Sequence, residues 1–465
     1  MISIVLLSVL GIANLFLGFL RSNRMLLPVA MLILIIVFGA NVLDWNAVSQ
    51  SYFNNMLTID RYSVAFTGIV VLTTLLLLPF SEKYVRDGEA NLAEYYSLLL
   101  FSLVGAIMMV SYDNLLMLFV GIEILSISMY VLAGSDKRNV RSNEAALKYF
   151  LMGSFATGIL LFGIALVYGA TGTFQLAQIG AGVANPANAS FTPMLYIGML
   201  LMFIGIGFKV SAAPFHYWTP DVYEGTPTFF TAFMSTVVKT AGFAAFWKLL
   251  NQAFPASEHF WIPTIMAMTV LTLLIGNVGA VAQNSAKRML AYSSISHAGY
   301  LFIGLVALNG KLSANGIFFY SLAYSIATVA AFAVLKLVID QRQREDYDGL
   351  NGLAKTNPLL AFVMTVAMLS LAGIPLTGGF FGKFFLFGAA VDKGHIGLVV
   401  FAVVMSMVGI YYYLRPVIAM YMRPAIDEED ATPVAVTSFQ SAVLVLLALL
   451  TIVLGILPSL VSNLL

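Results

Sequence analysis

The hydrophobic positions of this 465-residue chain gather into long segments that short polar stretches separate. About 20 apolar residues cross a bilayer as a helix, because a helix satisfies its own backbone hydrogen bonds there. The pattern therefore predicts an all-α polytopic membrane protein with about 14 transmembrane helices. They are expected at residues 2–20, 25–43, 60–80, 92–111, 114–133, 145–170, 193–213, 226–250, 261–283, 288–308, 313–338, 357–391, 396–422 and 439–461.

The twelfth segment, residues 357–391, is too long for one straight span at about 1.5 Å per residue. Gly373, Pro375 and Gly378 lie inside it, and these residue types interrupt helices where the freed backbone lines a cavity. Pro214 follows the seventh segment in a similar way. The sequence therefore predicts that helices 7 and 12 are broken.

Composition agrees with a membrane protein, since 60% of the residues are hydrophobic and only 10% are charged, against about 25% charged in soluble domains. The net charge of +1 gives no indication of nucleic-acid binding. The absence of cysteine excludes disulfides, thiolate-bound zinc and cysteine-ligated iron–sulfur clusters. Four scattered histidines and the lack of a glycine-rich nucleotide loop leave no cofactor or metal site to expect in this chain.

Lysine and arginine residues are distributed unevenly between alternate loops, with fifteen of the 23 on one side of the membrane. Such an excess marks the cytoplasmic side. With an even number of spans, both termini are then expected on the outer side. The opposite side is expected to hold Arg61, Lys248, Lys311 and Lys393.

One spacing occurs twice. Lys209 follows Glu123 by 86 positions, and Lys383 follows His297 by 86 positions. The offset of 174 between the two pairs predicts that helices 4–8 and 9–13 are copies of one five-helix unit. Five is odd, so the copies have opposite topology, as in many transporters. The expected divisions are a three-helix segment at 1–80, repeats at 92–250 and 261–422, and a last helix at 439–465.

Glu123, Lys209, Lys239 and Lys383 are ionisable residues within hydrophobic segments. A charge at this depth costs about 2.5–3.5 kcal/mol on insertion scales, so such residues are usually functional. A carboxylate with three lysines favours a proton relay. The alternatives are a neutral structural carboxyl for Glu123, a fixed ion pair for Lys239, and for Lys209 a side chain that reaches the cytoplasmic interface.

Two further residues are candidates for the relay. His297 belongs to a polar stretch, Tyr292-Ser-Ser-Ile-Ser-His-Ala-Gly-Tyr300, that could hold water, although a lone histidine in a helix is often simply packed. Lys148 lies one turn after Glu144 near the cytoplasmic end of its helix. An interfacial ion pair explains Lys148 adequately, and proton uptake is the alternative.

The loop at 214–228 is the densest polar and aromatic stretch of the chain. In one interpretation, Trp218 and Tyr223 lie at headgroup depth in an interfacial aromatic belt. In the other, His216, Asp221 and Glu224 line a vestibule for proton uptake.

The segment from Phe208 to Thr228, FKVSAAPFHYWTPDVYEGTPT, resembles the signature of the subunit N family of antiporter-like subunits in respiratory complex I, the proton-pumping NADH–quinone oxidoreductase. Residues 144–150 and 287–300 are similar to further patterns of that family, and the resemblance extends from about residue 60 to the C-terminus. Sister subunit M would carry glutamate where Lys383 stands. Subunit L would continue with a long lateral helix, whereas this sequence ends at Leu465.

The resemblance implies a proton-translocating subunit of the bacterial inner membrane, with both termini periplasmic. It implies partners among neighbouring antiporter-like and small membrane subunits and a peripheral redox arm. NADH, FMN, iron–sulfur clusters and quinone would belong to other subunits, and quinone reduction there would drive this one. An Mrp-type sodium/proton antiporter subunit without redox coupling is the alternative.

The resemblance also implies roles for single residues. Glu123 pairs with Lys209, Lys239 is the central lysine, and Lys383 lies on the exit side. His216 and His297 match positions thought to belong to the hydrated relay.

Overall fold

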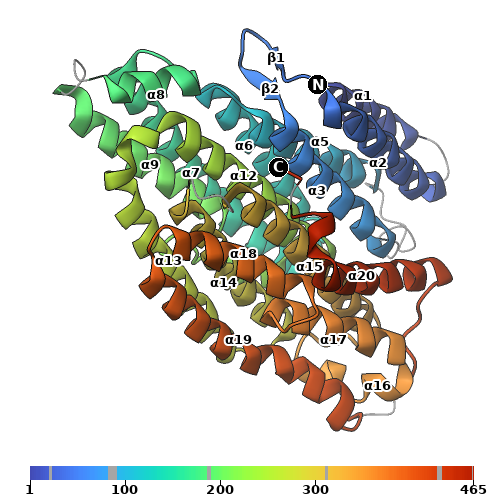
Figure 1. The fold of residues 1–465 in the computed structure, drawn as a ribbon. Helices are drawn as coiled ribbons and strands as arrows, with labels where there is room; N and C mark the ends of the chain where they lie inside the picture. The colour runs from blue at the N-terminus through green and yellow to red at the C-terminus, as the bar shows by residue number, and fades with distance from the viewer. Residues whose placement is uncertain (20–22, 82–91, 186–189, 309–312, 427–431, 463) are drawn as a thin grey trace.

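The computed structural model is a bundle of long helices and one small hairpin, and it describes residues 1–19, 23–81, 92–185, 190–308, 313–426, 432–462 and 464–465 (Figure 1). The first helices are α1 (Ile2–Leu17), α2 (Leu26–Leu43), α3 (Arg61–Leu77), α5 (Leu92–Ser111), α6 (Leu115–Ala133), α7 (Val140–Thr171), α8 (Leu176–Ala184), α9 (Thr192–Lys209), α10 (Thr219–Gly225), α11 (Thr228–Phe233) and α12 (Lys239–Ala253). The remaining helices are α13 (Glu258–Val281), α14 (Ala286–Val306), α15 (Ser313–Arg342), α16 (Leu353–Thr356), α17 (Pro358–Ala372), α18 (Gly378–Asp392), α19 (Ile396–Met422) and α20 (Ser438–Ile456).

Every predicted segment contains a helix, so the all-α polytopic prediction is confirmed. Among the described residues, 12 helices are long and apolar enough to cross a membrane. α1 and α17, with 16 and 15 residues, fall below that length. The count of fourteen spans therefore stays a prediction.

The twelfth segment is broken where glycine and proline predict it. α17 ends at Ala372, its C-cap Gly373 adopts a left-handed conformation with φ +84°, and α18 begins only at Gly378. α9 likewise ends at Lys209, and a non-helical stretch leads to the short helix α10. Both interruptions free backbone carbonyls near a lysine.

A third irregular turn, within a helical span, is not predicted by the sequence. Met234–Val238 form a π-helical turn between α11 and α12, in the middle of a fully buried span. Single π turns inside α-helices often occur at functional sites. Lys239 is the first residue after this turn.

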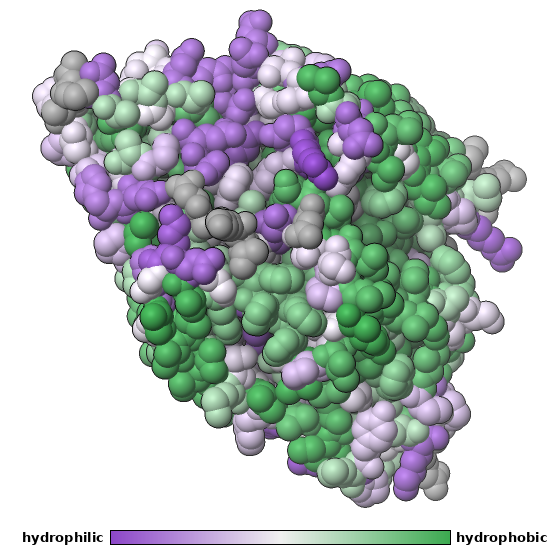
Figure 2. Space-filling model, in the orientation of Figure 1, coloured by the Kyte–Doolittle hydropathy of each residue, from purple (hydrophilic) through white to green (hydrophobic). Residues whose placement is uncertain are grey.

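The helices pack in the same order in the two halves. α5 lies against α6, as α13 lies against α14, and α7 lies against α9, as α15 lies against α17. In Figure 1, α1–α3 form one flank and α13 and α19 form the other, with α12, α14 and α15 between them. Hydrophobic residues cover the flank over α1–α3 and α20, whereas hydrophilic residues gather at the end that carries α8 and the hairpin (Figure 2).

The hairpin of β1 (Gln50–Tyr52) and β2 (Leu57–Ile59) caps this end of the molecule. Nearby, an antiparallel bridge joins Asn114, just before α6, to Gln175, just before α8. A second bridge joins Ser285, just before α14, to Asp346. Each bridge spans 61 positions, and the second lies 171 positions after the first (114 to 285 and 175 to 346). The internal repeat stays a prediction, which this matching pair of bridges favours.

Lys248 lies in α12, inside the predicted segment 226–250; its side chain is buried and its ammonium is 3.5 Å from Asp113 Oδ1. One expectation about the loop at 214–228 is wrong. Trp218 and Tyr223 are each only 1% exposed, so they do not form an interfacial belt. Trp218 instead donates its indole N–H at 3.0 Å to the Phe208 carbonyl at the end of α9, which also accepts the Ser211 backbone N–H at 3.1 Å. Lys311 is outside the described residues.

Candidate functional site

Lys209 is buried at the end of α9 and points toward α6. Its ammonium donates to Ser126 Oγ at 2.7 Å and to Tyr149 Oη at 3.2 Å. Ser126 is one turn after Glu123 on the same helix. Lys209 is therefore not exposed at the end of its helix, and it lies near Glu123, the residue with which the family resemblance pairs it.

The pairing of Glu123 with Lys209 is not a direct contact in this structure. Among the described residues, no ion pair joins the two side chains, and Glu123 Oε1 is buried without a hydrogen-bond partner. The two groups still interact electrostatically through space. Lys209 instead donates to the hydroxyls of Ser126 and Tyr149.

Aromatic rings close the space above Lys209. The ammonium is 5.3 Å from the ring centre of Tyr149 and 5.8 Å from that of Tyr130. Tyr149 stacks on Trp218 with ring centres 4.7 Å apart and planes 8° from parallel. Such rings attract a cation and exclude bulk water at the same time.

Lys239 is 1% exposed and reaches from α12 to α14. Its ammonium donates to the hydroxyl of Ser294 at 2.5 Å and to the carbonyl of the same residue. Tyr324 of α15 donates to the same hydroxyl at 3.1 Å. Among the described residues, Lys239 has no carboxylate partner, so it is not part of a fixed ion pair.

His297 lies in α14 between tyrosines of two other helices. Its Nδ1 is 2.5 Å from Tyr320 Oη and its Nε2 is 2.9 Å from Tyr413 Oη. Tyr413 Oη is also 2.5 Å from Ser293 Oγ, and the Tyr324 ring lies 4.7 Å from the imidazole ring. Both ring nitrogens are therefore hydrogen-bonded, in a cluster that extends toward Lys239 through Tyr324.

Lys383 lies on α18, just after the break. Its ammonium donates to the Ala372 carbonyl at 2.9 Å, one of the carbonyls freed at the end of α17, and to Ser406 Oγ at 2.7 Å. It also lies 4.5 Å from the ring centre of Tyr300. The break thus provides the acceptor that holds this buried lysine.

Lys148 lies in a network of ion pairs at the end of the bundle that carries most of the basic loops. It contacts Glu144 at 2.7 Å, as its spacing predicts, and also Asp221 of α10 at 3.0 Å. Arg288 of α14 contacts Asp221 at 3.0 Å and Glu224 at 2.5 Å. A pocket of about 320 Å³ adjoins this network, with Lys148 and Asp221 in its wall.

Asp221 remains ionised in this network. Burial alone would raise the pKa of its carboxyl group, but hydrogen bonds from Lys148 and Arg288 outweigh burial and hold the pKa below its ordinary value. Asp221 and Glu224 line the pockets at this end, as the vestibule interpretation expects.

His216 lies in the non-helical stretch between α9 and α10, where it is half-buried. Burial lowers the pKa of its imidazole, opposed by a hydrogen bond with the Pro214 backbone, and this favours the neutral form near pH 7. The structure does not connect it to Lys209 by any hydrogen bond among the described residues.

Several residues of the polar clusters were missed by the sequence analysis. They are Ser126 and Tyr149 around Lys209, Tyr324 beside Lys239, Tyr320 and Tyr413 around His297, and Ser406 at Lys383. Tyrosine and serine are common in membrane helices, and nothing local distinguishes those that meet a lysine. Only Ser126 could have been predicted, because it lies three positions, or about one helical turn, after the candidate residue Glu123.

Comparison with known proteins gives a consistent result. A family described as NADH:quinone oxidoreductase/Mrp antiporter, TM, matches residues 112–409. Subunit N of NADH-quinone oxidoreductase from Cytophaga hutchinsonii is 40% identical over 459 residues, which are 98% of this chain and 97% of that protein. The subunit N of Trichlorobacter lovleyi is 44% identical over 464 residues, or 98% and 94% of the two chains.

Solved structures are similar over nearly the whole chain. A chain of respiratory complex I from Thermus thermophilus with bound aureothin has a TM-score of 0.85 and 36% identity, covering 99% of this chain and 98% of that one. A chain of the Mrp complex from Dietzia sp. has a TM-score of 0.87 at 22% identity, covering 99% and 95%. At that identity the second likeness concerns the fold alone.

Proposed function

This chain belongs to the NADH:quinone oxidoreductase/Mrp antiporter membrane family and is an antiporter-like membrane subunit of NADH-quinone oxidoreductase, and from this premise we propose that its buried lysines carry protons across the membrane. Glu123 and Lys209 form the first group of the path. Lys239 forms the centre, and His297 and Lys383 lead from it toward the outer side.

The environment of Lys239 carries this proposal. The side chain is almost fully buried, yet it is bonded to a neutral serine instead of a carboxylate. A buried ammonium that has no counter-charge is easily deprotonated, because burial disfavours its charged form. Ser294, Tyr324 and His297 then offer hydroxyl and imidazole groups that accept and pass on protons.

The Glu123–Lys209 pair supports control of this path from outside the subunit. The two groups are beyond ion-pair distance here, with Lys209 held on Ser126. Quinone reduction elsewhere in the complex would change the local field and draw the pair together or apart. That movement alters the charge felt by Lys239 and so its tendency to release a proton.

The same proposal includes the orientation of the chain in the membrane and its partner subunits. The chain is a multi-pass membrane protein, and the loops richer in Lys and Arg face the cytoplasm, with both termini on the periplasmic side of the inner membrane. Neighbouring antiporter-like and small membrane subunits are its partners. NADH, FMN, iron–sulfur clusters and quinone belong to other subunits.

The two bridges with equal spacing support the division into repeats at 92–250 and 261–422, flanked by 1–80 and 439–465. Because the copies are inverted, the polar groups of one half reach inward from one side of the membrane and those of the other half from the opposite side. The polar path can thus extend across the bilayer.

An Mrp-type antiporter role is the weaker candidate. The subunit N relatives match 98% of the chain at 40% and 44% identity, whereas the Mrp structure shares 22%. The pairs of charged residues do not discriminate the two functions, because both would move protons through them.

Substitution of Lys239 tests the proposal. In the complete complex reconstituted into proteoliposomes, Lys239→Ala is expected to lower the number of protons pumped per electron, because the central proton-carrying group is lost. Lys393→Ala, an exposed lysine at the C-cap of α18, is the control and is expected to pump normally. A fully assembled Lys239→Ala complex with the wild-type ratio would refute the proposal.

A further inference from the structure

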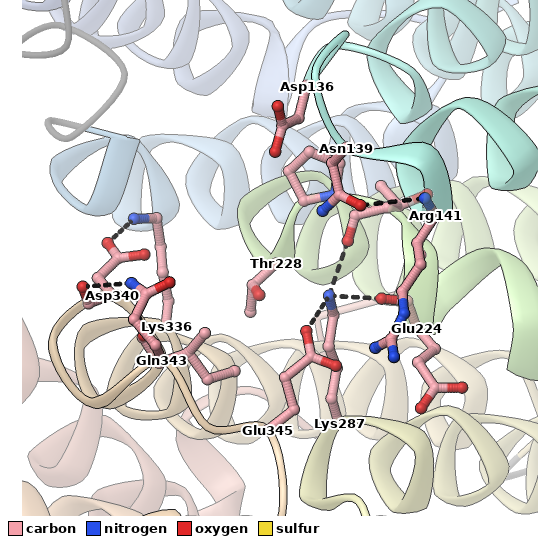
Figure 3. Close-up of a pocket in the computed structure, with 14 residues that line it drawn as sticks. Asp136, Asn139, Arg141, Glu224, Thr228, Lys287, Lys336, Asp340, Gln343 and Glu345 are labelled. Atoms are coloured by element: carbon pink, nitrogen blue, oxygen red, sulfur yellow. Dashed lines mark hydrogen bonds and ion pairs between the residues drawn. The ribbon is translucent and has the colours of Figure 1, made fainter.

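A second polar cavity at the basic end lies beside the ion-pair network but is not used by the path described above. It has a volume of about 300 Å³ and lies where the α6–α7 loop, α10, α14 and α15 meet (Figure 3). Its charged lining residues are Asp136, Arg141, Glu224, Lys287, Lys336, Asp340 and Glu345. Lys336 forms an ion pair with Asp340. Lys287 and Glu345 are therefore the candidate proton-transfer groups at the inner end of the cavity.

Lys287 forms the floor of this cavity. Its side chain is 3% exposed, and its ammonium donates to the carbonyls of Glu224 and Thr226 at 2.7 and 2.8 Å, where α10 ends. Glu345, 30% exposed, lies 3.4 Å from it on the solvent side. Figure 3 shows the ammonium between Glu345 and the end of α10. A proton from the cytoplasm thus meets a carboxylate first and the buried lysine next.

An unsatisfied hydroxyl group lies at the same place. Thr226 lines the cavity and is fully buried, yet its Oγ1 has no hydrogen-bond partner among the described residues. A buried hydroxyl without a partner is destabilising unless water completes its hydrogen bonds. The floor of the cavity is therefore suited to hold water.

Below the floor, polar groups continue toward Lys239. Thr231 donates to the carbonyls of Tyr223 and Thr226 at 2.9 and 3.2 Å, and so shares one acceptor with Lys287. The Tyr223 phenol interacts with Ser294, the residue that holds Lys239. Ser294 is also seven positions after Lys287 on α14, which places both on one face of that helix about 10 Å apart.

We propose that this cavity is a proton-uptake site for Lys239, and that the protons enter through Lys287 and not through Lys148 of the adjoining pocket, with which the cavity shares Arg141, Glu224 and Gly225. The Lys287 ammonium gives up one proton inward, to water at the Thr226 hydroxyl and from there to the Tyr223 phenol and Ser294, and takes one from the cavity through Glu345. Its charge is restored after each transfer. The inference rests on the proposed function, because Lys239 is the recipient.

Lys287→Met in the complete complex, reconstituted into proteoliposomes, tests the inference. The expected result is electron transfer from NADH to quinone together with a proton-to-electron ratio lowered to that of Lys239→Ala. Lys287→Arg keeps the positive charge but does not release a proton near neutral pH, so it is expected to fail as well. Lys355→Met, an exposed lysine at the same end, is the matched control and is expected to pump normally.

Tyr223→Phe keeps the packing and removes only the hydroxyl. It tests the same proton path if the Lys287→Met complex fails to assemble. Tyr223→Phe is also expected to lower the proton-to-electron ratio.

A wild-type proton-to-electron ratio in Lys287→Arg overturns the inference, since a fixed charge would then suffice. A reduced ratio in Lys148→Met with a normal one in Lys287→Met would place uptake at the other pocket. A normal ratio in Lys239→Ala would instead refute the proposed function itself.

Discussion

At the scale of single residues, the buried lysines of the proposed path are held by neutral acceptors. Lys209 is bonded to Ser126 and Tyr149, Lys239 to Ser294, and Lys383 to a freed carbonyl and to Ser406. A fully buried carboxylate partner would fix the charge, because losing the proton would leave an unpaired buried anion; Glu345 beside Lys287 is 30% exposed, so water can solvate it. Hydroxyls and carbonyls stabilise the ammonium and still allow the proton to leave.

The Tyr413 hydroxyl is expected to matter for proton release. Tyr413→Phe removes the group that bonds His297 at 2.9 Å and Ser293 at 2.5 Å. A hydrogen bond of this kind contributes about 1 kcal/mol, which predicts roughly fivefold slower pumping in proteoliposomes. Tyr411→Phe is the matched control, since Tyr411 is 60% exposed on the same helix. Equal pumping rates in the two variants would exclude Tyr413 from the relay.

At the scale of elements, the ends and irregular turns of helices position the lysines. Lys209 is the last residue of α9, and Lys239 directly follows the π turn. Lys383 faces the carbonyl freed where α17 ends. Because carbonyls at such points have no partner within their helix, they can bind a buried cation.

A second group of cations stabilises the corners between helices. Lys248 of α12 pairs with Asp113 and lies over the ring of Tyr112. Arg415 of α19 bonds the corner before α14 through the Gln283 carbonyl at 2.6 Å. The two cations occupy matching places beside the two bridges of equal spacing, so we interpret Lys248 as a structural residue of this corner.

The break before Lys383 is expected to depend on Gly373. An alanine there would have to adopt a left-handed conformation, at about 1–2 kcal/mol, and its Cβ would lie 2.9 Å from Cδ of Lys383. Gly373→Ala is therefore expected to lower both the proton-to-electron ratio and the melting temperature of the purified complex. In the control Gly397→Ala the new Cβ meets nothing within 4 Å. Unchanged pumping in Gly373→Ala would contradict this role of the break.

At the scale of the whole molecule, one network of ion pairs joins the two halves. Lys148 of α7 contacts Asp221 of α10, which in turn contacts Arg288 of α14. Asp221 is thus the bridge between helices on either side of the proposed path. Each partly exposed pair contributes only about 0–1 kcal/mol, so its main effect is to fix the position of α10.

The network predicts a pH-dependent contribution to stability. Because the pKa of Asp221 is lowered in the folded protein, its stabilising effect is complete at neutral pH and declines once the pH falls below about 4, the ordinary aspartate value. Asp221→Asn should lower the melting temperature of the complex by a few degrees near pH 7, and by less near pH 3.5. Asp392→Asn, at an exposed position, should cause no such change. A difference independent of pH would exclude the ionised carboxylate as the cause.

The sequence by itself determined the helical membrane architecture, the break at Gly373 and the depth of Glu123 and Lys239. These features depend on residues that are close together in the sequence: the length of a hydrophobic segment, the positions of glycine and proline, and the presence of a charge within an apolar segment. They can therefore be predicted without a structure.

Only the tertiary structure decided which groups meet. In a bilayer every face of a helix is apolar, so the pattern of residues does not indicate which face is turned toward another helix. The contact of His297 with Tyr413 joins positions 116 residues apart, and Lys248 proved to be buried. Such pairings depend on how the helices pack, because neutral hydroxyls carry no local signal that distinguishes a proton path from an ordinary interior.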